Sequence, residues 1–258
     1  MKITVLTENT SINENIGCEH GLCLYIETEN KKILFDMGET DIFYENAKVL
    51  GIDLSKVDLA VLSHAHCDHT GGLGKFLEVN NKAFVYANQN AKGDQYGHEG
   101  VYIGIDAELK SNGRIIYTND TFEIEKGLTL YSCNEKKREY EFGSFGLCER
   151  IGEEILPDRF LHEQYLLIKE KDKKVLISGC SHKGILNIAS WFDVDFIVGG
   201  FHFMHVEPGE ILKGYAKHLG EKKTKFLTCH CTGIEQFEFM KKYAENIRYI
   251  RAGERLEI

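Results

Sequence analysis

Three histidines and an aspartate fall within six residues of the chain, at His64, His66, Asp68 and His69. They directly follow the apolar run 57–62, which is typical of a buried strand that leaves the core. In an extended chain, positions i and i+2 face the same way, so His64 and His66 can bind one cation as neutral nitrogen ligands. Asp68 and His69 then supply a carboxylate oxygen and an imidazole that suit a second cation nearby. Four solvated polar residues in a loop would be a poor explanation for so dense a cluster.

Later segments repeat this arrangement of a strand followed by a histidine. The predicted strands and their histidines are 174–178 with His182, 196–198 with His202, and 225–228 with His230. We therefore expect four strand ends to deliver histidines to one edge of the fold. His182 and His230 are predicted metal ligands, whereas His202 could bind metal or contact the substrate. Cys180, next to His182, is either a thiolate ligand or a small buried residue.

The remaining histidines have other expected positions. His20 follows Glu19, and we expect it to line the pocket or donate a proton rather than bind metal. His98 is expected at the surface. His205 and His218 are expected outside the site.

The elements that must position these residues alternate between strands and helices. This pattern predicts an α/β (α+β) fold, a four-layer αββα sandwich with helices outside two packed sheets and the site at the mouth between them. The predicted strands are 3–6, 22–27, 32–35, 57–62, 83–86, 114–117, 121–124, 128–131, 164–169, 174–178, 196–198, 225–228 and 247–250; the predicted helices are 40–50, 72–79, 185–191, 208–219 and 233–244.

We expect a single domain over residues 1–258, because no stretch rich in proline, glycine or serine resembles a linker and the chain has only 2 prolines. From about 88 to 158 the periodicity weakens and glycines interrupt it. This segment is predicted to be a variable insertion that covers the site and sets the choice of substrate.

Composition limits the partners. The formal charge of -9 argues against nucleic acid, because phosphate backbones bind basic surfaces. It allows a small anionic substrate, since bound cations reverse the potential locally. No apolar run approaches the roughly 20 residues that span a bilayer, and the start of the chain is soon acidic. We therefore expect a cytoplasmic protein that does not bind membranes; the sequence leaves its oligomeric state open.

The chain has 8 cysteines, and in a cytoplasmic protein these are expected to be reduced thiols, ligands or core residues. None forms the Cys-x-x-Cys pairs of ferredoxin-type clusters or structural zinc sites. A redox centre is therefore a secondary interpretation.

The motif His-x-His-x-Asp-His at 64–69 resembles the signature of the metallo-β-lactamase superfamily. Three further motifs are similar to those of that family, and they lie at 35–38, 178–180 and 229–233. The resemblance implies that Asp36 supports the metal loop, although a turn-capping role is the alternative. It also implies that His162 is a ligand of the third motif. Cys180 stands where many relatives carry a bridging aspartate, and a thiolate there would favour zinc or iron.

More narrowly, the chain resembles the subfamily that contains the dihydropterin-methyl ribofuranosylaminobenzene phosphate synthase of methanopterin biosynthesis. The segments that carry this resemblance are 19–21, 179–182, 199–202 and 230–233. The same fold hosts many chemistries, so this one named activity does not decide the reaction.

The leading functional hypothesis is a hydrolase with two divalent metal ions, zinc by preference and manganese or iron as alternatives. The cations would activate water against a phosphoester or a similar group. Asp68 would orient the nucleophile, and His20 or His202 would protonate the leaving group.

Three alternatives remain. The subfamily resemblance suggests a transferase in which a second substrate displaces pyrophosphate from a pterin diphosphate. A different class is an iron-binding redox or sensor protein that uses Cys180. The last is a binding protein that has kept its metals without catalysis.

Overall fold

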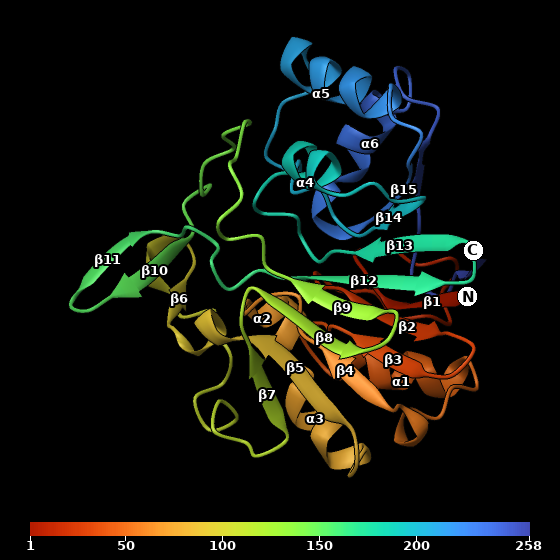
Figure 1. Cartoon of the computed structure of the whole chain (residues 1–258), viewed down its shortest axis with the longest axis vertical. Coiled ribbons are helices and arrows are strands. Elements are labelled where there is room, and N and C mark those ends of the chain that lie inside the picture. Colours follow the sequence, from red (N-terminus) through yellow and green to blue (C-terminus); the bar gives the residue numbers. More distant parts are fainter.

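The computed structural model describes all residues from 1 to 258, and two seven-stranded sheets form most of it (Figure 1). In order across the first sheet, the strands are β17 (Arg255–Glu257), β1 (Lys2–Thr7), β2 (Cys23–Glu27), β3 (Lys32–Phe35), β4 (Leu59–Val61), β5 (Phe84–Asn88) and β7 (Ile115–Thr118). Across the second they are β16 (Ile247–Tyr249), β15 (Lys225–Thr228), β14 (Phe196–Val198), β13 (Lys173–Ile177), β12 (Tyr165–Glu170), β9 (Leu128–Tyr131) and β8 (Thr121–Glu125).

Helices cover the outer faces of both sheets, with α1 and α3 on the first sheet and α4, α5 and α6 on the second (Figure 1). The α-helices are α1 (Ile42–Val49), α2 (Cys67–Thr70), α3 (Leu73–Val79), α4 (Ile185–Trp191), α5 (Glu210–Gly220) and α6 (Ile234–Met240). Four short 3-10 helices are η1 (Leu54–Lys56), η2 (Gln89–Lys92), η3 (His98–Gly100) and η4 (His230–Thr232). None of the helices is long and apolar enough to span a membrane.

Alternating side chains explain the layers. In β3, Ile33 and Phe35 join the core between the sheets, whereas Leu34 packs under the helices of the first sheet. In β13, Val175 and Ile177 join that same central core, whereas Leu176 packs under the helices of the second sheet. Each sheet therefore buries one face against the other sheet and one face against helices. This arrangement confirms the predicted four-layer sandwich.

Most helix boundaries lie within two residues of the predicted ones, except that α6 ends at Met240, four residues before its predicted end. In α5 the buried residues Leu212, Ala216 and Leu219 recur at helical spacing on one face. The helix begins at Glu210, two residues later than predicted, because the preceding Gly209 has an extended backbone.

Parallel pairing of strands brings the segments that carry the predicted ligands to one edge of the sandwich. Strands β3, β4, β5 and β7 are parallel neighbours, as are β13, β14, β15 and β16. The carboxyl ends of parallel strands meet at one edge of a sheet. The segments that follow β4, β13, β14 and β15 therefore all reach the mouth between the two sheets.

Only part of the segment 88–158 lies outside the sandwich. Strand β7 extends the first sheet, and β8 and β9 extend the second. A small third sheet, which the sequence did not predict, joins β6 (Gln95–Tyr96), β10 (Cys148–Ile151) and β11 (Glu154–Pro157). This sheet projects to the left in Figure 1. Strand β17 was also not predicted, and it pairs with β1 after the chain has returned to the first sheet.

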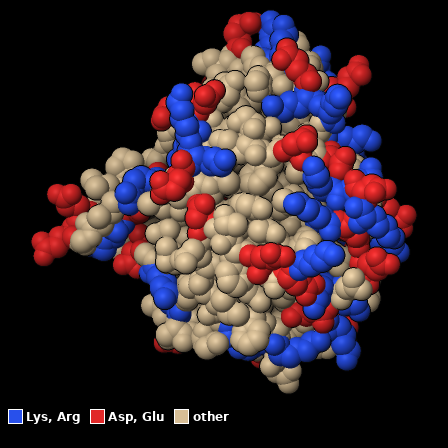
Figure 2. Space-filling view, in the orientation of Figure 1, with Lys and Arg blue, Asp and Glu red and all other residues tan.

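Charged side chains on the face in Figure 2 are mixed in sign. Lysine and arginine alternate with aspartate and glutamate, and a broad area without charge lies between the two helical layers.

Candidate metal centre

Two groups of ligand side chains meet where the sheets open. The first is His64, His66 and His182, all buried. The second group contains Asp68, His69, Cys180 and His230. Within each group, every residue offers one ligand atom within 4.8 Å of the others. Seven of the eight predicted metal ligands are thus brought together in two adjacent sets.

The spacing within both sets suits a small tetrahedral cation. The Nε2 atoms of His64 and His182 are 3.3 Å apart, and those of His69 and His230 are 3.2 Å apart. Asp68 Oδ2 lies 3.2 Å from His230 Nε2. Two ligands about 2.0–2.1 Å from a tetrahedral zinc lie roughly 3.3 Å from each other. In addition, His66 Nε2 is buried with no hydrogen-bond partner, which is an arrangement that a cation would satisfy.

Burial and neighbouring charges shift the pKa values of the histidine ligands in different directions. Burial lowers the pKa of His64 and of His182, and neighbouring imidazoles lower both further. Both rings are therefore neutral near pH 7, the form that binds metals. Burial also acts to lower the pKa of His69, but Asp68 and Asp36 raise it to about 10. A cation bound at His69 would have to displace that proton.

Asp36 sets the tautomers of two ligands. Its Oδ1 accepts a hydrogen bond from the Ser63 N–H, and its Oδ2 accepts one from the Ser63 hydroxyl, both at 2.6 Å. Asp36 Oδ2 also accepts from His69 Nδ1 at 2.7 Å. Because the Ser63 hydroxyl donates to Asp36, its oxygen accepts from His64 Nδ1 at 2.7 Å. Both rings therefore keep a proton on Nδ1 and direct Nε2 toward the proposed cations, and His69 would lose its second proton, on Nε2, when a cation binds. These contacts agree with the supporting role that the resemblance implied for Asp36.

We expect Asp36→Asn to weaken metal binding by about 10–100-fold, because the amide replaces an acceptor that serves several donors. Metal affinity can be measured by competition with a chromophoric chelator, and the fully exposed Asp193→Asn provides a matched control. Ser63→Ala removes the hydroxyl that links Asp36 to His64 but keeps the bonds of Asp36 to the Ser63 N–H and to His69, so it tests the His64 tautomer separately. Unchanged affinity in both folded variants would contradict this role.

His162 lies in a different environment from the other predicted ligands. Its Nδ1 accepts a hydrogen bond from the Ala65 N–H at 3.1 Å, so its Nε2 carries the proton and donates to Asp158 Oδ2 at 3.0 Å. Neither ring nitrogen is free to bind a cation in this arrangement. The structure therefore favours His162 as a residue that positions the loop after His64, in contrast to the predicted role as a ligand.

Asp158 was not identified from the sequence, although it lies four residues before His162. Its Oδ2 is 3.7 Å from His66 Nε2, and it forms a third acidic and imidazole cluster with His66 and His162. Burial acts to raise the pKa of Asp158, but His162 and His66 outweigh this effect and hold it below its usual range. Asp158 is therefore ionised beside His66.

The loop after β1 supports His230 and His20. His230 Nδ1 donates to Asn9 Oδ1 at 2.7 Å, and the backbone N–H of His230 donates to Glu8 Oε2 at 3.1 Å. The Asn9 amide in turn donates to His20 Nδ1 at 3.2 Å. The proton of His20 is then on Nε2, which lies 3.5 Å from Asp68 Oδ2. No signal in the sequence pointed to Asn9, because its two histidine partners are 11 and 221 residues away along the chain.

Four site residues other than glycine have a left-handed backbone. The φ angles are 58° at Asp36, 59° at Ser181, 56° at His202 and 51° at His230. Such conformations cost on the order of 1 kcal/mol or more each and persist where the surrounding structure holds them. Here they turn the chain sharply at the strand ends, so that the side chains converge on one site.

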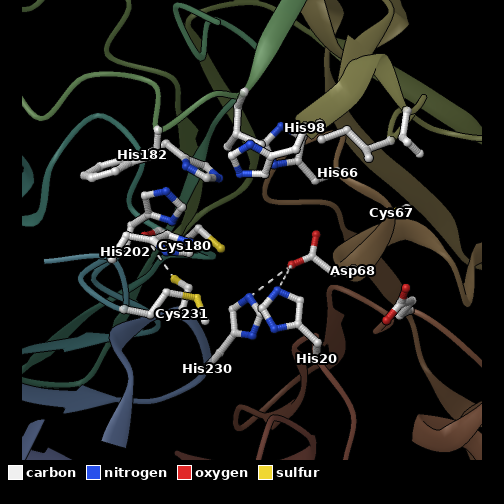
Figure 3. Close-up of a pocket in the computed structure, with 18 residues that line it drawn as sticks. His20, His66, Cys67, Asp68, His98, Cys180, His182, His202, His230 and Cys231 are labelled. Carbon is white, nitrogen blue, oxygen red and sulfur yellow. Dashed lines mark hydrogen bonds and ion pairs between the residues drawn. The ribbon is translucent and has the colours of Figure 1, made fainter. Parts of the chain in front are cut away.

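A cavity of about 310 Å³ opens over these groups (Figure 3). Its polar side includes His66, Asp68, Cys180, His182, His202 and His230, together with Cys231 and His20. Its apolar lining is formed mainly by Val101, Ile103, Phe145, Leu147 and Met204. No lysine or arginine is among the 18 lining residues. Any anionic group of a ligand would therefore meet imidazoles and bound cations rather than permanent positive side chains.

Two histidines lie closer to the site than predicted. His98 and His205 both line the cavity, whereas the sequence placed His98 at the surface and His205 outside the site. Gly146 allows the approach of His98, because a Cβ at Gly146 would lie 2.6 Å from the His98 ring. His218 is remote from the cavity and packs against Tyr140, as expected.

Comparison with known families gives a consistent result. Residues 16–205 match the model of a family described as the metallo-beta-lactamase superfamily. A protein of Methanocaldococcus jannaschii described as uncharacterized is 30% identical in an alignment of 247 positions that covers 90% of this chain and 91% of the relative. A second protein of that organism, 7,8-dihydropterin-6-methyl-4-(beta-D-ribofuranosyl)-aminobenzene-5'-phosphate synthase, is 29% identical over 98% of this chain and 95% of its own length.

Solved structures show the same fold. The crystal structure of Tm1679, described as a metal-dependent hydrolase of the beta-lactamase superfamily, aligns with a TM-score of 0.82 and 30% identity. The alignment covers 100% of this chain and 99% of Tm1679. The metallo-beta-lactamase fold protein YhfI of Bacillus subtilis aligns with a TM-score of 0.61 and 12% identity, over 100% and 99% of the two chains. At that identity, the second comparison supports the fold alone.

Proposed function

Because the chain belongs to the metallo-β-lactamase superfamily, we propose that it is a metal-dependent hydrolase that uses two cations to cleave a phosphoester or a similarly activated bond. The observation that carries this proposal is the pair of adjacent ligand sets beneath one open cavity. A purely structural site would not need access for a substrate.

Each set suits one cation. His64, His66 and His182 would hold the first, and the second group, which includes Asp68 and His230, would hold the other. The imidazole and thiol donors favour zinc, whereas manganese or iron are alternatives. When bound, such cations lower the pKa of a water molecule and polarise an oxygen of the substrate.

Asp68 is placed to orient a nucleophilic water. Its side chain is 16% exposed and reaches the cavity, while His69 and His230 approach its Oδ2. Burial acts to raise the pKa of Asp68, but His69 and His230 hold it well below its usual range. The carboxylate therefore stays ionised and can accept a hydrogen bond from water.

His20 and His202 are the candidates for proton donation to the leaving group. The Nε2–H of His20 faces Asp68 at the cavity rim, and its side chain is 49% exposed. His202 lies across the cavity, and both of its ring nitrogens are buried without hydrogen-bond partners. His202 can reach a substrate without breaking any hydrogen bond. The ring of His20 is bonded to Asn9 through Nδ1, and its Nε2–H remains available to a substrate.

The walls of the cavity suggest the kind of substrate. An anionic group would bind at the cations, since the lining has no lysine or arginine. The apolar side, with Val101, Ile103, Phe145 and Leu147, suits a hydrophobic or aromatic portion of the same molecule. We therefore propose a small anionic substrate with an apolar ring or chain.

A transferase is the second candidate. It is supported by the relative of 29% identity, which is named as a synthase that joins a dihydropterin to a ribosylated aminobenzene. In this alternative, an aromatic amine or ring carbon of a second substrate would displace a diphosphate leaving group that the cations hold. The apolar wall of the cavity is compatible with two ring-bearing substrates.

One assay distinguishes the candidates. The zinc-loaded or manganese-loaded protein is incubated with a panel of phosphomonoesters and phosphodiesters, and separately with a pterin diphosphate in the presence or absence of a ribosylated aniline phosphate. Product from an ester alone supports the hydrolase. Pyrophosphate release that requires both substrates supports the transferase. No turnover of any of these compounds by metal-loaded protein counts against both.

A further inference from the structure

Another cluster of possible ligands, which contains two cysteines, lies beside the two sets described above. Cys180, His202 and Cys231 each offer a ligand atom within 4.8 Å of the others. Cys180 is also a member of the second set, with its Sγ 3.1 Å from His69 Nε2. In Figure 3 the two sulfur atoms and the His202 ring lie together on one side of the cavity, across from Asp68. The sequence predicted no role for Cys231.

The ring of His202 is held in place without a hydrogen bond. Both of its nitrogens are buried and have no partner, which is unfavourable for a polar group. Its backbone has a φ of 56°, and its ring packs against His182 and Phe145 at centroid distances of 4.3 and 5.2 Å. A cation would satisfy one of these unpartnered nitrogens.

The backbone around Cys231 leaves space for a sulfur atom. A Cβ added to Gly200 would lie 2.4 Å from Cys231 Sγ, so only glycine permits the sulfur to occupy this position. The thiol makes one weak hydrogen bond, to the Cys180 carbonyl oxygen at 3.5 Å. The same Gly200 lies two residues before His202, so the Gly-Gly-Phe-His segment both admits the sulfur and delivers the ring.

From this geometry we propose that Cys180, His202 and Cys231 bind a third cation, a thiolate-ligated zinc or another soft divalent metal. Two thiolates and one imidazole form the donor set of zinc sites that keep a fourth position open for water or substrate. All three residues line the cavity, so the open position would face it. Cys180 would then bridge this cation and the one in the second set. If His202 binds this cation it does not also protonate the leaving group, which leaves His20 as the proton donor in the proposed function.

Cobalt substitution tests the proposal, because thiolate ligands give cobalt(II) a charge-transfer absorption that imidazoles and carboxylates do not. The full-length protein is freed of metal under reducing conditions and titrated with Co²⁺. We expect wild type to bind three equivalents and Cys231→Ser to bind two, with the charge-transfer absorption per chain clearly reduced. Cys18→Ser is the matched control, since Cys18 is exposed and does not line the cavity, and it should behave as wild type.

His202→Gln is a second variant that tests the same site if Cys231→Ser does not fold. It should also bind one equivalent of cobalt fewer than wild type. Circular dichroism verifies that both variants are folded. Two equivalents in wild type, with an unchanged spectrum in both folded variants, overturn the third site but leave the two-cation proposal intact. Failure of wild type to bind any cobalt overturns both. A Cys180–Cys231 disulfide would appear as two fewer free thiols in protein purified without reductant. If that protein still binds no third equivalent of cobalt after reduction, the third site is also overturned.

Discussion

Asp68→Asn should reduce kcat/KM by about 10³-fold, because it removes the only carboxylate of the second ligand set while keeping its shape. The Oδ2 of Asp68 lies 3.2 Å from His230 Nε2, 3.4 Å from His69 Nε2 and 3.5 Å from His20 Nε2. An amide has no negative charge to balance a cation, and its NH₂ group would oppose an imidazole donor. Both the metal content and the rate should therefore fall.

The measurement pairs steady-state kinetics with metal analysis of the same preparation. Asp172→Asn, at an exposed position in the turn between β12 and β13, is the control and should leave both values unchanged. A folded Asp68→Asn protein that retains two cations and full turnover would show that Asp68 neither binds metal nor orients the nucleophile.

Removal of metal is expected to abolish activity and to lower thermal stability. Without cations, the buried ligand groups contact mainly one another, as the 3.3 Å contact between the His64 and His182 Nε2 atoms shows, and His66 Nε2 has no partner. A ligand at 100 times its Kd stabilises a folded protein by about 2.7 kcal/mol per site. Loss of both cations therefore costs about 5.4 kcal/mol, and the melting temperature should fall on the order of 10–20 °C. Dialysis against a strong chelator, followed by differential scanning calorimetry and the ester assay, measures both effects.

Addition of zinc or manganese to the depleted protein should restore activity. Magnesium is the discriminating control, because it prefers octahedral oxygen ligands and should not replace a cation among imidazoles. Full activity in protein with less than stoichiometric metal would refute the metal-dependent mechanism. Iron with a visible absorption band in the protein as purified would instead favour the redox or sensor alternative and make Cys180 central to it.

Local pattern was sufficient to predict much of this protein. The cluster His64, His66, Asp68 and His69 was identified because its spacing is short and follows a recognisable strand. The sandwich was predicted from the succession of strands and helices and from the recurrence of histidines at strand ends. Parallel strands then require their carboxyl ends to meet at one edge, so the convergence of His182 and His230 on the loop could be inferred before their contacts were known.

Tertiary structure decided how individual groups are used. The sequence could not show that both nitrogens of His162 are occupied, because its partners Ala65 and Asp158 approach from separate segments. It also could not place His98 in the cavity, since the segment that carries His98 has no periodicity and is oriented by contacts with residues near Gly146. Spacing along a chain specifies directions only over a few residues of regular structure. Only the packed fold supplies the neighbours that set the tautomer of an imidazole and leave a ring nitrogen without a hydrogen-bond partner. The same packing decides whether two thiols lie close together.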